Sequence, residues 1–260
     1  MAYSPEPTAT IDQLRVYRCE SPAELGALAA DMLTDAIQSV VAERGSCNLI
    51  MATGNSQLPL YTVLRERDLP WGAVRVLHMD EYLGLDEHHS ASFQGYMRRE
   101  LADRVPLKAF YGIRGDVADP AAEIARYSEL LRTYPADVCV LGIGENGHLA
   151  FNDPPADFTT DALVHIVTLD QVCRQQQVGE GHFASLDAVP KQALTLTVPA
   201  LLSARMVLAI VPEARKAEIV RRTLTEPISP ACPATILRRQ AHAHLFLDAA
   251  SASRSDDLLN

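Results

Sequence analysis

The chain has 260 residues, of which 48% are hydrophobic and 22% are charged, so it can bury the core of one large α/β domain or of two small ones. We take a single domain over residues 1–260 as the expectation. The formal net charge of -10 would repel nucleic acid and anionic lipid, and the basic residues gather only in short pairs. We therefore expect neither a nucleic-acid partner nor a membrane partner.

The start of the chain and its cysteines indicate the cellular compartment in which we expect the protein. No run approaches the roughly 20 apolar residues of a membrane-spanning helix, and MAYSPEPTATID lacks the basic and apolar regions of a secretory signal. A cytoplasmic protein is expected. The five cysteines are widely spaced without a CxxC pair, so neither a disulfide framework nor a thiolate zinc site is indicated. Residues 1–10 are expected to form a loose tail.

Apolar strands and amphipathic helices alternate along the chain. A helix is predicted from Ser21, a good N-cap, to Gly45, a common stop signal. A buried strand over 47–52, a turn over 53–57 and a helix over 58–67 follow as half of a βαβ unit. Further on, the pattern predicts strands at 74–78, 137–141, 164–168, 206–210 and 244–247, and helices near 92–104, 120–133 and 213–223.

Continuous apolar strands that alternate with helices indicate a mostly parallel sheet covered on both faces. The predicted fold class is therefore α/β, a three-layer, Rossmann-like architecture. Sheets of this kind bind ligands at the carboxyl ends of their strands, where the loops gather. Three loops that follow predicted strands hold the unusual residues of this sequence.

The first loop is a candidate anion site built from Thr53, Gly54, Asn55 and Ser56. Gly54 permits close backbone approach, small polar side chains can donate hydrogen bonds, and a helix begins at once. The acidic chain would disfavour a phosphate at long range, so a phosphate site has to be local in this way. The loop is not a P-loop, since the GxxxxGK[ST] spacing is absent. An ordinary helix-capping turn is the alternative.

The second loop places two adjacent carboxylates, Asp80 and Glu81, at the end of the strand over 74–78. Consecutive side chains diverge there, so one can face a cleft as a proton acceptor while the other pairs elsewhere. A solvated acidic turn is the alternative. The neighbouring pair His88-His89 does not predict a metal, because adjacent histidines rarely share one face and no third ligand stands at a usual spacing.

The third loop has a formal GxGxxG at Gly142, Gly144 and Gly147, the pattern of dinucleotide sites. That fingerprint must open a helix, whereas here Pro154-Pro155 would end one almost immediately, so nicotinamide binding is a minor alternative. The loop presents candidate catalytic residues for proton transfer on sugar oxygens, with a structural histidine as the alternative: His148, Asp153 and Asn146.

Together these loops resemble one family, the glucosamine-6-phosphate deaminases and their sisters the 6-phosphogluconolactonases. The resemblance covers most of the chain, and the MDEY segment leans toward the deaminases. The matching stretches are ATGNSQLPLY, HMDEYLGL, SFQGYMRREL, DVCVLGIGENGHLAFNDPP, VPKQALTLTVPALLSA, VPEARKAEIV and CPATILRRQ.

The resemblance implies that glucosamine 6-phosphate and water become fructose 6-phosphate and ammonia, without a cofactor or metal. His148 would open the sugar ring. Asp80 would remove the C2 proton and return it to C1. Glu81 would support Asp80 without contacting the substrate. A related sugar-phosphate isomerase, a lactonase and a non-catalytic sugar-phosphate sensor stay open as alternatives.

The resemblance also implies a phosphate site on the Gly54–Ser56 backbone, with Lys216 as its cation. Many deaminases have Asp where this chain has Asn146, and Glu where it has Asp153. The family's phosphate-binding Arg before the VPK segment has no counterpart, and His182 or Arg174 lies nearest in sequence. A homo-oligomer stays open, because the family contains hexamers and simpler enzymes.

Overall fold

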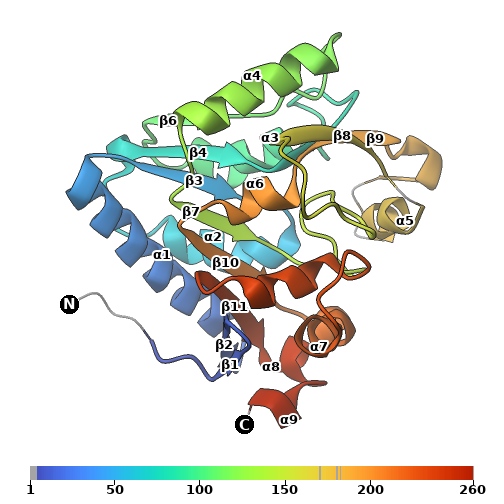
Figure 1. Cartoon of the computed structure of the whole chain (residues 1–260). Coiled ribbons are helices and arrows are strands. Elements are labelled where there is room, and N and C mark those ends of the chain that lie inside the picture. The colour runs from blue at the N-terminus through green and yellow to red at the C-terminus, as the bar shows by residue number, and fades with distance from the viewer. Residues whose placement is uncertain (1–4, 170, 180, 182, 260) are drawn as a thin grey trace.

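The structure, a computed structural model, describes residues 5–169, 171–179, 181 and 183–259, without the side chains of 172, 173 and 176. An eight-stranded sheet in the order β1-β2-β11-β10-β7-β3-β4-β6 forms its centre (Figure 1). β1 is antiparallel to β2, and all other neighbours in this sheet are parallel. The strands are β1 (Ala9–Ile11), β2 (Leu14–Cys19), β3 (Cys47–Met51), β4 (Val74–His78), β6 (Ala109–Tyr111), β7 (Val138–Leu141), β10 (Met206–Val211) and β11 (Ala243–Asp248).

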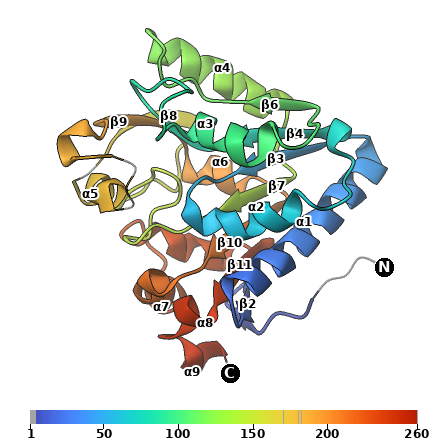
Figure 2. The ribbon, with the colours of Figure 1, turned by 180° about the vertical axis from the view of Figure 1, so that it is seen from behind.

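Helices cover both faces of this sheet, which confirms the predicted three-layer α/β fold (Figures 1 and 2). The period of two along β7 shows why: Val138 and Val140 pack on one side, and Cys139 and Leu141 on the other. The first side carries α1 (Pro22–Arg44), α2 (Leu58–Leu64) and α3 (Phe93–Met97). The second carries α4 (Pro120–Thr133), α6 (Val198–Leu202), α7 (Ala217–Thr225) and the 3-10 segment Pro233–Arg239, with α8 (Ala249–Ala252) and α9 (Asp256–Leu259) near its edge.

A second sheet departs from the predicted pattern. β5 (Asp80–Tyr82), β9 (Gln192–Leu196) and β8 (Val164–Thr168) pair antiparallel in the order β5-β9-β8. The expectation that 164–168 joins the parallel sheet was therefore wrong. From His165 to Thr168 of β8, half-buried residues alternate with exposed ones, the pattern of a strand with one solvated face. Helix α5 (Gln171–Gly179) follows β8.

Several boundaries also differ from the sequence expectation. The end expected for the loose tail, residue 10, was wrong, because β1 begins at Ala9. The helix expected over 92–104 changes to a π-helical turn at Arg98–Ala102, and the one expected from 213 begins as a 3-10 turn at Ala214–Lys216. Further 3-10 turns lie at Asn55–Gln57, Trp71–Ala73 and Leu186–Ala188.

Helix α1 is capped as expected and forms part of the core. Ser21 Oγ accepts the Glu24 N–H at 3.2 Å, and Gly45 ends the helix with φ 75°. Among the described residues, α1 alone is long and apolar enough to cross a membrane, judged by length and composition only. The expectation that no segment comes near such a length was therefore wrong. Its buried face packs on the sheet and on α2, where a Cβ on Gly26 would lie 2.5 Å from the Pro59 carbonyl.

The strand order places a topological switch point between β3 and β7. From β3 the chain continues to β4 and β6 on one side, then returns to β7, β10 and β11 on the other. Helices leave adjacent strands on opposite faces at such a point, so the loops after β3 and β7 part and leave a crevice at the carboxyl ends of the strands. The three loops singled out in the sequence end at this edge.

Candidate active site

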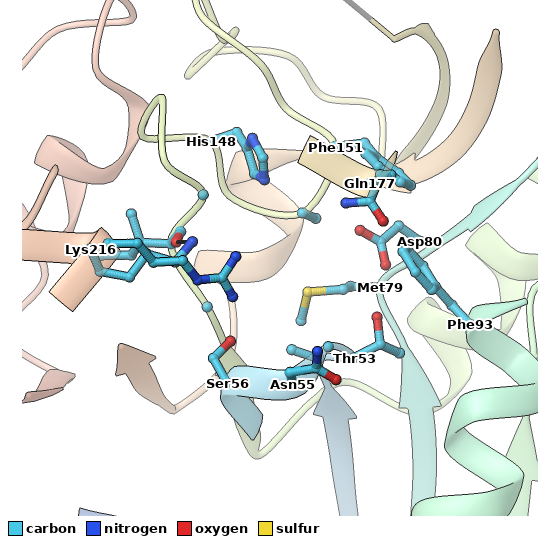
Figure 3. A pocket seen from close by; sticks show the side chains of 17 residues that line it. Thr53, Asn55, Ser56, Met79, Asp80, Phe93, His148, Phe151, Gln177 and Lys216 are labelled. Atoms are coloured by element: carbon cyan, nitrogen blue, oxygen red, sulfur yellow. Dashed lines mark hydrogen bonds between the residues drawn. The ribbon is translucent and has the colours of Figure 1, made fainter. Parts of the chain in front are cut away.

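A pocket occupies this crevice and collects residues from loops after β3, β4, β7 and β10 (Figure 3). Most of the site residues predicted from the sequence line it: Thr53, Gly54, Asn55, Ser56, Asp80, His148 and Lys216. In Figure 3, Asp80 lies at one end of the pocket, Ser56 and Lys216 lie at the opposite end, and His148 lies between these ends. Strand ends that are distant in sequence thus bring candidate acid-base groups and a candidate anion site together.

Asp80 is buried and faces the pocket. It stands just beyond the end of β4 and opens β5, where it pairs with Thr195 of β9. The residue is only 6% exposed, which rules out the solvated acidic turn considered as the alternative. Burial, and next the charge of Glu81, hold the pKa of Asp80 well above its usual range. Such a carboxylate is a stronger base than an exposed one.

The neighbouring Glu81 faces away and caps α3. Its carboxylate accepts hydrogen bonds from Ser92 Oγ at 2.8 Å and from the backbone N–H groups of Tyr82, Phe93 and Gln94 at 2.9, 3.1 and 2.8 Å. Burial raises its pKa to about 7, although these hydrogen bonds oppose the shift. The two carboxylates therefore have separate surroundings: one faces the pocket and the other fixes the start of a helix.

The glycines of the third loop shape a tight turn around His148. Gly147 has φ 93°, which favours glycine, and its N–H donates to Gly144 O at 2.9 Å. A Cβ on Gly144 would lie 2.2 Å from the His148 ring, so only glycine lets the imidazole lie against the backbone here. Residues 145–152 form turns and an isolated bridge rather than a helix, which removes the structural context of a dinucleotide fingerprint.

Asp153 and Asn146 hold this loop in different ways. His148 Nδ1 lies 3.1 Å from Asp153 Oδ1, an ion-pair distance without the alignment of a hydrogen bond. Asn146 donates from Nδ2 to the same Asp153 oxygen at 2.9 Å and accepts the His148 backbone N–H at 3.0 Å. Asn146 therefore orients the backbone of His148 and the carboxylate of Asp153, not the imidazole ring.

The opposite end of the pocket has the features of an anion site. Gly54 takes φ 99° and leads into the 3-10 turn Asn55–Gln57 and then α2. Nothing lies within 4 Å of where a Gly54 Cβ would stand, so the backbone there is open to a ligand. Lys216 is buried, and its Nζ donates to Ile143 O at 2.8 Å, which fixes the ammonium at the pocket.

Arg174, one of the two residues nearest to the missing arginine in sequence, does not supply this end. Arg174 Nη2 donates to the carbonyl of Val189 at 3.2 Å and to that of Leu186, and Arg174 does not line the pocket. His182 lies outside the described residues. Sequence reasoning missed Arg215, whose signal was its place beside Lys216, and it missed Gln177 of α5, whose side chain points toward Asp80 in Figure 3.

No metal site stands out in the part of the chain that the structure describes. Within that part, no three His, Cys, Asp or Glu side chains form a group that could hold a metal ion. His88 lines a separate cavity beside Glu81, and the ring of His89 stacks on Phe183 at 5.9 Å between centroids. The described cysteines, Cys19, Cys47, Cys139 and Cys232, are buried and free.

Residues 20–246 match the family model of glucosamine-6-phosphate isomerases and 6-phosphogluconolactonases. The chain belongs to this family. It is 36% identical to a glucosamine-6-phosphate deaminase from Exiguobacterium sibiricum over 220 residues, which are 85% of this chain and 86% of the relative. It is 30% identical to a glucosamine-6-phosphate deaminase from Streptococcus uberis over 243 residues, or 94% of this chain and all of the relative.

Solved structures agree with this assignment. The fold superposes on a monomeric glucosamine-6-phosphate deaminase with a TM-score of 0.84 and 30% identity, covering 92% of this chain and 99% of that one. A 6-phosphogluconolactonase from Shewanella baltica gives a TM-score of 0.75 at 22% identity, covering 92% of this chain and 100% of that one. At that identity the lactonase shows a shared fold only.

Proposed function

We propose that this protein is an aminosugar-phosphate deaminase that converts glucosamine 6-phosphate and water into fructose 6-phosphate and ammonia. One observation carries the proposal. A buried carboxylate with a raised pKa, that of Asp80, shares one pocket with His148 and with a backbone turn and a lysine suited to phosphate. The names of the relatives support a deaminase over a lactonase.

Ring opening is the first step of the proposed mechanism. His148 takes the proton of the anomeric hydroxyl and gives a proton to the ring oxygen, which yields the open-chain aldehyde. Asp153, 3.1 Å from Nδ1 of the imidazole, stabilises the ring when it carries the extra proton. The Gly144–Gly147 turn keeps the imidazole at the pocket throughout.

Proton transfer between carbons is the second step. Asp80 removes the C2 proton, the substrate ammonium gives up one proton and the aldehyde oxygen gains one, which together give an enolamine. Asp80 then returns a proton to C1, leaving an iminium at C2 that water converts to the ketone with release of ammonia. A base must lie within hydrogen-bond reach of the proton it takes, and its pKa should be close to the working pH. Burial moves the pKa of Asp80 upward, which is the direction that this second condition requires.

The anion end holds the substrate by its phosphate. Backbone N–H groups of the Gly54–Ser56 turn and the buried Lys216 ammonium offer both hydrogen bonds and positive charge. Acid-base chemistry of this kind requires neither a metal nor an organic cofactor. We further propose that the protein works in the cytoplasm, where phosphorylated sugars are held.

The proposal is tested by following ammonia and fructose 6-phosphate from glucosamine 6-phosphate, with galactosamine 6-phosphate and 6-phosphogluconolactone in parallel. We expect equal amounts of ammonia and fructose 6-phosphate from the gluco substrate. Ammonia from the galacto epimer alone would keep the mechanism and change the substrate. Hydrolysis of the lactone without any ammonia would overturn the deaminase, and binding of all three sugars without turnover would indicate a sensor.

A further inference from the structure

Arg215 is a second cation at the phosphate end of the pocket, beside Lys216. The two residues close the 3-10 turn Ala214–Lys216 that follows β10. Lys216 presents a point charge and is already bound to Ile143 O. A guanidinium instead offers a planar fork of N–H donors that matches two oxygens of a phosphate at once. The two cations can therefore serve the same ligand in different ways.

Two carboxylates from two loops aim the guanidinium of Arg215. Its Nε donates to Glu213 Oε2 at 2.7 Å, a short charge-assisted bond, and its Nη1 donates to Glu145 Oε1 at 3.3 Å. The Arg215 side chain is 30% exposed and lines the pocket, so the guanidinium is reachable from there. The Nε contact is the tight one, whereas the contact with Glu145 is long for a charged pair and can yield to a stronger anion.

The backbone at Glu213 supports a dedicated role for this arrangement. Glu213 takes φ 85° and ψ 141°, a backbone region that residues other than glycine rarely adopt. Its N–H donates to both Asp248 carboxylate oxygens at 3.2 Å. A glycine would occupy the position without strain, but it could not hold the Nε of Arg215. The strained conformation thus coincides with a side chain that fixes the guanidinium.

We propose that Arg215 binds the substrate phosphate through its guanidinium, with Glu213 as the positioning residue and Glu145 as the carboxylate that the phosphate displaces. This inference rests on the proposed function for the identity of the ligand. Glu145 lies three residues before His148 in the same loop, so the exchange also links the phosphate end of the pocket to the loop that carries the imidazole.

Affinity for the proposed product and for inorganic phosphate tests Arg215 without relying on turnover. Binding of fructose 6-phosphate and of inorganic phosphate is measured by calorimetry for the wild type, Arg215→Met and Arg215→Lys, with Arg132→Met as the matched control. Arg132 pairs with Glu129 on α4 and is 63% exposed, away from the pocket. We expect Arg215→Met to weaken both ligands about 10- to 100-fold, Arg215→Lys to restore part of the loss, and the control to bind normally.

Phosphate affinity in Glu145→Gln distinguishes phosphate binding by Arg215 from a merely structural role of that residue. Removal of the displaced carboxylate should tighten phosphate binding by roughly 2- to 5-fold, since one competing charge is lost. Wild-type affinity in Arg215→Met, or no gain in Glu145→Gln, would overturn the role of Arg215. Ammonia release by the wild type would stand in that case. Conversely, binding losses in Arg215→Met with no ammonia from any aminosugar would sustain the phosphate site and overturn the deaminase.

Discussion

The orientation of a single imidazole depends on a hydrogen atom at Gly144. A methyl group there would lie 2.2 Å from the His148 ring, so the ring must leave its place in Gly144→Ala. Because small misplacements of a catalytic group can cost about 10²-fold in rate, we expect kcat to fall by about that factor. Affinity for fructose 6-phosphate should persist. Gly72→Ala, whose Cβ would meet nothing within 4 Å, is the control, and an unchanged kcat in Gly144→Ala would contradict the placement.

At the same scale, some site residues follow from sequence and others do not. Asp80 and His148 stand just after apolar strands, and the rule that strand ends meet at one edge brings them together. The partners of Asn146 were not predictable, because the conformation of the turn decides whether an amide meets a ring or a backbone N–H. Gln177 gave no signal, since it sits in a polar helix far from the motif loops.

At the scale of the elements, the first turn of α3 is held by the Glu81 carboxylate, which accepts the N–H groups of Phe93 and Gln94. In Glu81→Gln an amide faces donors that need two carboxylate oxygens, and we expect a loss of about 1–3 kcal/mol in unfolding free energy. The charge of Glu81 also helps to raise the pKa of Asp80. Without it that pKa falls, so Asp80 stays ionised to lower pH and the acid limb of kcat/KM moves to lower pH.

The matched control for that variant is Asp119→Asn at the start of α4. Asp119 Oδ1 accepts the N–H groups of Ala121 and Ala122, and Asn caps a helix about as well as Asp. Both stability and the pH profile should stay near those of the wild type. An acid limb in Glu81→Gln that stays in place, or moves to higher pH, would contradict the coupling of the two carboxylates.

Most elements of the main sheet could be predicted, whereas the second sheet could not. The strands β3, β4, β7, β10 and β11 are mainly apolar, and α1 carries its own cap and stop signal. β5 has only three residues, DEY, and reads as a polar loop. Its strand conformation comes from pairing with β9, more than a hundred residues later, which is a tertiary effect that local patterns do not contain.

For the whole molecule, the end of the sheet opposite the pocket carries stability rather than chemistry. Asp137, just before β7, is 2% exposed and accepts hydrogen bonds from the Arg44 guanidinium and from the Asn48 N–H at 2.9 Å. It ties the end of α1 to the first residues of β3 and β7. A substitution at this end should therefore change the stability of the fold without changing the activity of the site.

We expect Asp137→Asn to lower the free energy of unfolding by about 1–3 kcal/mol. The midpoint of thermal unfolding should fall by about 2–4 °C for each kcal/mol. The kcat at 25 °C should not change, because the pocket lies at the far ends of these strands. Asp103→Asn serves as the control, because Asp103 is exposed and pairs only loosely with Arg98, at 3.6 Å. A drop in kcat without a drop in thermal stability would contradict this division.

Turnover of glucosamine 6-phosphate by Asp80→Asn, beside the wild type, tests the central claim most directly. The substitution keeps the shape of the side chain and removes the base. We predict that the wild type releases ammonia and that kcat falls by about 10²- to 10⁴-fold in the variant, while fructose 6-phosphate still binds. Wild-type turnover in Asp80→Asn, or a wild type that releases no ammonia, would contradict the account.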